Sequence, residues 1–192
     1  MKHEATTLMT KTALAASLKK FMERKPLSKI SIKEIIEDCG VNRKTFYYHF
    51  QDINDLVKWM FEAEAIEVVK QYDLIIDYQD AIRFVLDYVE ENKHICNCAL
   101  DALGRDELKR FFQRDFLTLI GRIVGHLSEG LSVPEDYKVF LINFYTEALA
   151  SLLIEWVRNK EHYDKEKIVK YISTIYGYDA IKLTLERAEN DL

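Results

Sequence analysis

The chain has 192 residues, of which 48% are hydrophobic and 31% are charged, and its formal net charge is −5. This balance excludes a disordered chain and is enough for one large domain or two small ones. No apolar run approaches the roughly 18–20 residues that a membrane span needs, and the N-terminal segment lacks the apolar core of a signal peptide. We therefore expect a cytoplasmic protein with no membrane segment.

The charge is distributed unevenly along the chain. Residues 1–50 carry ten Lys/Arg and five Asp/Glu, whereas residues 51–192 carry the other 17 Lys/Arg and 27 Asp/Glu. The first segment is therefore +5 and the second −10. A basic end on an acidic body suits a protein that faces a polyanion with one end. A charge run is also common on an ordinary solvated face, so the asymmetry supports this interpretation without proving it.

Helical signals follow one another from the N-terminus. Only six glycines and two prolines interrupt the chain, and apolar residues recur at three- and four-residue spacing, so we expect an all-α fold. Ser31, Asn42 and Asp52 are suitable N-caps, and Ser31 with Glu34 has the spacing of a capping box. The N-terminal helices are predicted over residues 7–24, 32–38, 43–49 and 53–70.

The helix over 43–49, with the short helix and turn before it, forms a helix-turn-helix. At about 100° per residue, Phe46 and Phe50 define its buried side. Its other side and rim carry hydrogen-bond donors and no carboxylate: Arg43, Lys44, Thr45, Tyr47, Tyr48 and His49. Such groups suit phosphate oxygens and base edges in a major groove. The alternative is a capped core helix that is merely aromatic.

The acidic body is also expected to be helical. We predict an amphipathic helix around Ala81–Val89 and a loop over 91–98. Three further helices are predicted, one after Gly104, a long one opened by Pro134 and one beginning near Asp164. Gly177 is read as a break, and the tail after it is either helical or loosely attached.

Several of these residues resemble the DNA-binding region of the TetR family of bacterial transcription regulators. The resemblance is carried by SIKEII at 31–36, by GVNR at 40–43, and above all by TFYYHF at 45–50 followed by Leu56. It covers about a quarter of the chain. Within the family, NRKTFYYHF leading into DLVKWMFE resembles the subgroup of DhaS, which activates dihydroxyacetone kinase operons. Some members of that subgroup sense their signal through a partner protein.

The resemblance implies a homodimer that binds a palindromic double-stranded operator, with a DNA-binding domain over 1–52 and a helical regulatory and dimerisation domain over 53–192. Arg43, Lys44 and Thr45 would read base edges. Tyr47 would bind a phosphate, Tyr48 and His49 would contact backbone or bases, and Ser31 would offer its hydroxyl to a phosphate. Many relatives have Lys-Asn-Lys where this chain has Gln-Asp-Ile at 51–53, so a usual phosphate contact is missing.

The resemblance also implies that the last two long helices form an intermolecular four-helix bundle. The predicted interface residues are Ile142, Tyr145, Leu149, Leu152, Leu153, Trp156, Ile168, Ile172, Ile175 and Tyr176. A cavity for a small-molecule effector is predicted to be lined by Tyr88, Phe112, Phe116, Tyr145 and Trp156. For both sets the alternative is ordinary intramolecular core, and the sequence does not decide between repression and activation.

Other function classes find little support. Cys96 and Cys98 near His94 are a weak metal or redox signal and are read as packing thiols, so we expect no metal and no cofactor. The sequence contains no Gly-rich phosphate loop, nucleophile elbow or His-x-x-x-His, and an enzyme is not expected. A helical adaptor or co-regulator that acts through a partner protein is the main alternative to a DNA-binding regulator.

Overall fold

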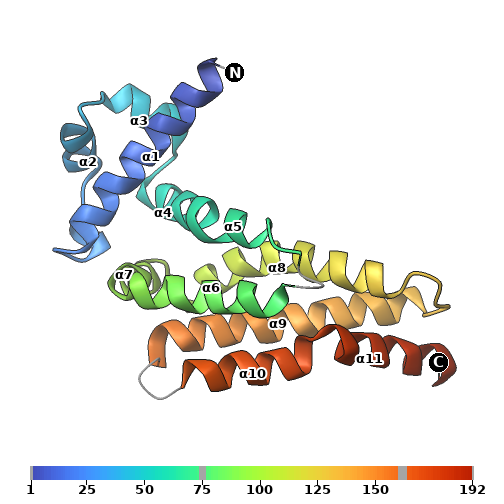
Figure 1. The fold of residues 1–192 in the computed structure, drawn as a ribbon. Coiled ribbons are helices and arrows are strands. Elements are labelled where there is room, and N and C mark those ends of the chain that lie inside the picture. Colours follow the sequence, from blue (N-terminus) through green and yellow to red (C-terminus); the bar gives the residue numbers. More distant parts are fainter. Residues whose placement is uncertain (1, 74–76, 160–163, 192) are drawn as a thin grey trace. The chain divides into compact units, whose positions relative to one another are not determined.

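The computed structural model describes residues 2–73, 77–159 and 164–191, and these residues form helices and no strand, as the predicted all-α class requires. The chain packs as two compact units. Unit 1 runs from the N-terminus to Glu67 and includes Asn92–Arg105, and unit 2 comprises Val68–Glu91 and the residues from Asp106 onward. Figure 1 labels the helices of both units. The functional boundary predicted between residues 52 and 53 stays a prediction.

Unit 1 is built around its first helix. Its elements are α1 (Lys2–Met22), η1 (Leu27–Lys29), α2 (Ile32–Cys39), α3 (Arg43–His49), α4 (Ile53–Phe61), the π-helical turn η2 (Glu62–Ile66) and α7 (Lys93–Leu103). The helix α1 packs against α2, α4 and α7. Leu14, Leu18 and Met22 of α1 are fully buried, as are Ile35 of α2 and Phe46 of α3. One spine of apolar side chains on α1 therefore holds the helix-turn-helix in place.

Two details of unit 1 differ from the sequence-based prediction. The predicted helix over 53–70 is less regular, because α4 gives way to η2 before α5 (Glu67–Val69). The predicted loop over 91–98 is wrong, because α7 begins at Lys93. Asn92 suggested a break, yet Ile95 and Ala99, one helical turn apart, are both buried and draw the segment into a helix.

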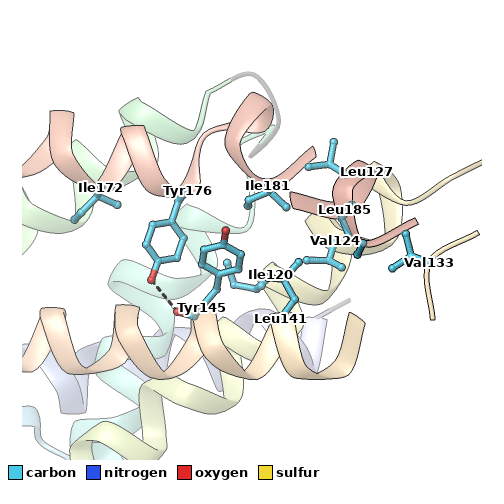
Figure 2. Packing of buried hydrophobic residues seen from close by; sticks show 11 residues of the cluster. Ile120, Val124, Leu127, Val133, Leu141, Tyr145, Ile172, Tyr176, Ile181 and Leu185 are labelled. Atoms are coloured by element: carbon cyan, nitrogen blue, oxygen red, sulfur yellow. Dashed lines mark hydrogen bonds between the residues drawn. The ribbon is translucent and has the colours of Figure 1, made fainter. Parts of the chain in front are cut away.

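Unit 2 is built around a large apolar core and also contains a smaller cluster of Val69, Ala81 and Leu119. Its helices are α5, which begins at the end of unit 1, α6 (Tyr78–Glu91), α8 (Arg105–Leu127), α9 (Glu135–Asn159), α10 (Lys165–Tyr176) and α11 (Tyr178–Asp191). Side chains from α8, α9, α10 and α11 meet in the cluster drawn in Figure 2. Tyr145 and Tyr176 lie at its centre, with ring centroids 4.8 Å apart, and the Tyr176 hydroxyl donates to the Tyr145 carbonyl oxygen at 3.0 Å.

The tail after Gly177 is a packed helix. Ile181 and Leu185 of α11 are fully buried in the same core as α10. Gly177 separates the two helices, and a Cβ atom added to it would lie 2.6 Å from the Ser173 carbonyl oxygen. Only glycine therefore permits this close approach of the backbone, which explains the predicted break.

The helix α9 is long and apolar enough, over Glu135–Arg158, to cross a membrane by length and composition alone. Its most apolar window has a mean hydropathy of 1.3 and is 39% buried. Core helices of soluble proteins often have this composition, so the finding is weak evidence for a membrane span.

Candidate nucleic-acid interface

The N-terminus of α2 is fixed by a complete capping box. The Ser31 hydroxyl oxygen accepts the Glu34 backbone N–H, while the Ser31 backbone N–H donates to the Glu34 carboxylate at 2.9 Å. Lys25 contacts the other carboxylate oxygen at 2.6 Å. The Lys25 hydrogen bond and the two bonds from Ser31 lower the pKa of Glu34 from 4.5 to about 2. Ser31 also donates its hydroxyl to Glu34, so in this structure it serves the cap.

The turn and α3 follow from a few local interactions. Gly40 ends α2 with a φ of 67°, a left-handed conformation that glycine adopts without strain. Asn42 caps α3 and accepts the Thr45 backbone N–H at 2.8 Å and the Thr45 hydroxyl at 3.1 Å. Phe46 is fully buried and Phe50 nearly so. These contacts hold one side of α3 against unit 1.

The other side of α3 faces solvent. Tyr48 is 71% exposed and Tyr47 is 47% exposed, which is unusual for aromatic side chains of a monomeric surface. The Arg43 guanidinium donates to the Tyr47 hydroxyl at 3.1 Å and lies over its ring. The Tyr48 ring meets the half-buried His49 ring edge to face, with centroids 4.9 Å apart. Six of the seven predicted DNA-contacting residues thus lie together on α3, and Ser31 lies at the start of α2.

Four lysines of α1, α2 and the segment between these helices are already paired. Lys19, Lys20, Lys25 and Lys33 each form an ion pair with a carboxylate of unit 1. By contrast, Lys44 on the exposed side of α3 forms no ion pair among the described residues. Lys44 is therefore a cation of α3 that remains available to an anionic partner.

The start of α4 shows what replaces the missing lysine of the family pattern. Asp52 accepts the Asp55 backbone N–H at 2.8 Å, and the Asp55 carboxylate accepts the Gln51 backbone N–H at 3.0 Å. The carboxylates of Asp52 and Asp55 therefore accept two backbone N–H groups at this helix end. Nearby, the Lys11 ammonium lies 5.6 Å from the ring centroids of both Phe50 and Trp59. These contacts place the Lys11 ammonium near the C-terminal end of α3.

The predicted effector residues are divided between a cavity and ordinary core. Unit 2 contains a cavity of about 200 Å³ between α6, α8, α9 and α10. Phe116 and Trp156 line it, whereas Phe112, Tyr145 and Tyr88 do not. Phe112 stacks on Phe116 with centroids 6.3 Å apart, and Tyr145 packs in the core of Figure 2. The lining residues that sequence reasoning missed come from α5, α6, α8, α9 and α10.

The predicted interface residues are likewise divided. Leu152 and Ile175 are exposed on α9 and α10, while Tyr145, Leu153, Trp156, Ile172 and Tyr176 are buried within their own unit and Ile142, Leu149 and Ile168 are partly buried. Sequence reasoning missed four large exposed hydrophobic side chains on the same two helices. These are Val139, Phe140, Phe144 and Tyr171, which are 50%, 61%, 56% and 58% exposed. The spacing of these residues can be read from the sequence, but the side of each helix that faces solvent cannot.

The cysteines of α7 lie in packing positions. Cys96 and Cys98 are buried, and burial raises the pKa of both thiols, that of Cys96 to about 12. The Cys98 sulfur lies 3.9 Å from His94 Nε2. Within the described ranges, no group of three or more His, Cys, Asp or Glu side chains could hold a metal ion.

Comparisons with known proteins match both parts of the chain. A family model described as "Bacterial regulatory proteins, tetR family" matches residues 14–60. A second, "Transcriptional regulator C-terminal region", matches residues 77–177, which is more than half of the chain.

Individual relatives agree with these models. The chain is 26% identical over 87 residues to the HTH-type dhaKLM operon transcriptional activator DhaS of Lactococcus lactis subsp. lactis (strain IL1403). This aligned region covers 45% of this chain and 46% of that protein. The match therefore spans about half the length of that relative. An HTH-type transcriptional regulator of Staphylococcus aureus (strain USA300) is 22% identical over 165 residues, covering 82% of this chain and 86% of its own.

Two solved structures share the fold. The dihydroxyacetone kinase operon activator DhaS superimposes with a TM-score of 0.70 at 18% identity, covering 94% of this chain and 98% of its own. NalD, the secondary repressor of the MexAB-OprM multidrug efflux pump in Pseudomonas aeruginosa, gives a TM-score of 0.57 at 16% identity, covering 88% of this chain and 94% of its own. Together with the two matching family models, these likenesses show that the chain belongs to the TetR family of transcriptional regulators.

Proposed function

We propose that this TetR-family regulator binds a palindromic operator as a homodimer, with one α3 helix in each of two successive major grooves. The observation that carries the proposal is the exposed side of α3, which presents cationic and hydroxyl donors without a single carboxylate. A polyanion with acceptor-rich groove edges is the partner that such a surface suits.

Each donor has a proposed task. Arg43, Lys44 and Thr45, in the first turn of α3, read base edges. Tyr47 binds a phosphate, and its hydrogen bond to Arg43 orients both side chains before DNA arrives. Tyr48 and His49 contact the backbone or bases, and Ser31 contributes a phosphate contact when its hydroxyl turns from Glu34 to the DNA. The two helices must lie about 34–36 Å apart to reach successive grooves.

Dimerisation is proposed to use α9 and α10. Both helices expose apolar side chains, including Phe140 and Phe144 of α9 and Tyr171 and Ile175 of α10. Large exposed apolar side chains on neighbouring helices are a feature of protein–protein interfaces. Of the predicted interface set, Leu152 and Ile175 contribute directly, and the buried members support the helices from behind.

We further propose that the protein works in the cytoplasm by control of operator occupancy and carries out no catalysis. DhaS is named an activator and NalD a repressor, so one fold serves both outcomes. Ile53 stands where many relatives have a phosphate-binding lysine. Operator affinity is therefore expected to be modest and to depend on salt through few phosphate contacts.

The test is sequence-specific binding by the full-length protein. Operator duplexes would first be selected from a random double-stranded pool. Binding of a selected duplex would then be measured by gel shift, with the same duplex and a scrambled duplex of equal composition as competitors. We expect the selected sites to be palindromic and preferred by on the order of 10³-fold or more. Equal competition by both duplexes would contradict the proposal and favour the helical adaptor.

A further inference from the structure

The cavity of unit 2 is made from apolar side chains on several helices. Its walls include Val85 of α6, Ile120 of α8, Leu153 of α9 and Ile172 of α10, together with Val69 of α5. At about 200 Å³ it is much larger than the voids that native cores usually contain. The cavity is partly open to solvent, so its apolar side chains keep a surface in contact with water that a bound molecule would cover.

Water gains little from such a lining. A bound water needs two to four polar partners. Few polar groups border the cavity, namely those of Tyr78, Glu155, Trp156 and Tyr176. The Tyr176 hydroxyl is turned away, since it donates to the Tyr145 carbonyl oxygen. An apolar molecule is the occupant that this lining favours.

The charge of the lining restricts the occupant further. Among the described residues that line the cavity none is lysine, arginine or histidine, and Glu155 is the one ionisable carboxyl group. An anionic ligand would lose its hydration without gaining a counter-charge from these residues. The described lining residues therefore favour an uncharged ligand over a phosphorylated or carboxylated one.

The size and access of the cavity set the remaining limits. An apolar protein cavity of about 150 Å³ is known to bind benzene, so this cavity has room for a slightly larger ring compound. The cavity is partly open at the surface of unit 2, so the space can be reached from outside. The wall residue Val69 belongs to α5, which continues directly from α4 and η2 along the chain.

We propose that this cavity binds a compact, uncharged, largely apolar molecule about the size of a monosubstituted benzene, and that such a molecule is the signal the regulator senses. The second clause rests on the proposed function, whereas the first stands on the cavity alone. The proposal also differs from sensing through a partner protein, because a folded partner cannot fill an interior space.

Tryptophan fluorescence gives a direct binding assay. The chain has two tryptophans, Trp59 in unit 1 and Trp156 in the cavity wall, so a Trp59→Phe background leaves one reporter at the site. Benzyl alcohol is the uncharged test ligand, and benzoate is its anionic counterpart of similar shape. We expect saturable fluorescence change and a Tm increase of about 2–4 °C at roughly ten times Kd with benzyl alcohol. Benzoate at the same concentrations should give neither.

A matched pair of variants locates the site. Ala81 lines the cavity and Ala188 does not, yet both are alanines buried to a similar degree in unit 2. Ala81→Val should weaken benzyl alcohol binding about tenfold or more, and Ala188→Val should leave it unchanged. If Ala81→Val does not fold, discrimination between benzyl alcohol and benzoate by the Trp59→Phe protein still decides the matter.

Three results would overturn the proposal: no saturable binding of benzyl alcohol, equal binding of benzoate, or undiminished binding by folded Ala81→Val protein. None of these measurements contains DNA. Failure of the cavity proposal is therefore distinguishable from failure of operator binding, which the gel shift reports.

Discussion

The helices α3 and α9 both expose aromatic side chains, and they do so with different chemistry. On α3 the exposed rings are Tyr47 and Tyr48, which carry hydroxyl groups beside Arg43. On α9 they are Phe140 and Phe144, which have no polar atom and stack at a centroid distance of 6.2 Å. A ring with a hydrogen-bonding group suits a wet, charged partner, whereas a bare ring gains from leaving water altogether.

The supports beneath the two surfaces differ as well. The short helix α3 depends on two buried rings, Phe46 and Phe50, and on the Asn42 cap. The long helix α9 is held by a broad core that includes Tyr145 and its contact with Tyr176 (Figure 2). The DNA-facing surface should therefore be sensitive to single changes in its support, and the α9 surface should tolerate them.

The largest expected effect compares one buried and one exposed phenylalanine. Phe46→Ala should destabilise the protein by about 3–5 kcal/mol, because it leaves a cavity at a fully buried site. Phe144→Ala should change the stability of the monomer by no more than about 0.5 kcal/mol, because its side chain is 56% exposed. Urea denaturation followed by circular dichroism, at a concentration where the protein is monomeric, measures both. Equal losses would refute the contrast.

The second effect concerns assembly. A Phe140→Glu/Phe144→Glu protein should keep its helical content but sediment as a monomer, since four charges would enter a symmetric apolar interface. Operator affinity should fall on the order of 10²-fold as bivalent binding is lost. Analytical ultracentrifugation and gel shift report the two quantities. Lys138→Glu, which changes a charge on the same helix two residues before Phe140, serves as a charge control. A charged variant that still sediments as a dimer would place the interface elsewhere.

The third effect compares two lysines of the helix-turn-helix. Lys44→Ala should weaken operator binding about tenfold and reduce the slope of log K against log salt by about 1, because an unpaired cation meets DNA. Lys33→Ala should have a smaller effect, because Lys33 is already within 3.8 Å of the Glu37 carboxylate. Fluorescence anisotropy at several salt concentrations measures both. A larger loss for Lys33→Ala would reverse the assignment of the DNA-facing side.

How well the sequence predicted each feature depends on how far apart in the chain the interacting residues lie. The caps Ser31, Asn42 and Asp52 act over three residues, and all three form the predicted hydrogen bonds. The exposed side of α3 was predictable for the same reason, since Phe46 and Phe50 alone set its orientation. Signals that are local in the chain and strong in energy can be read without the fold.

Features that depend on several helices could not be read in this way. The cavity needs four helices to enclose it, and Val85 has the same periodicity whether it faces a void or a neighbour. The outward side of α9 depends on where α10 and α11 pack, so Phe140 and Phe144 were missed. The helix α7 was predicted to be a loop, whereas burial of Ile95 and Ala99, one helical turn apart, favours a helix.

The smallest effect tests the local support of the helix-turn-helix through acid. The pKa of Glu34 is lowered from 4.5 to about 2, so its contribution to stability is complete above about pH 4.5 and is lost as the pH falls towards 2. Glu34→Gln keeps a capping-box side chain but cannot pair with Lys25, so it should lose less stability than the native protein across this interval. Thermal denaturation at a series of pH values would show the two Tm curves converging as the pH falls. Glu37→Gln, on the exposed side of the same helix, is the control for removal of a carboxylate from α2. Parallel curves for Glu34→Gln would mean that the charge of Glu34 does not support α2, and the capping hydrogen bonds alone would then hold the helix on which α3 rests.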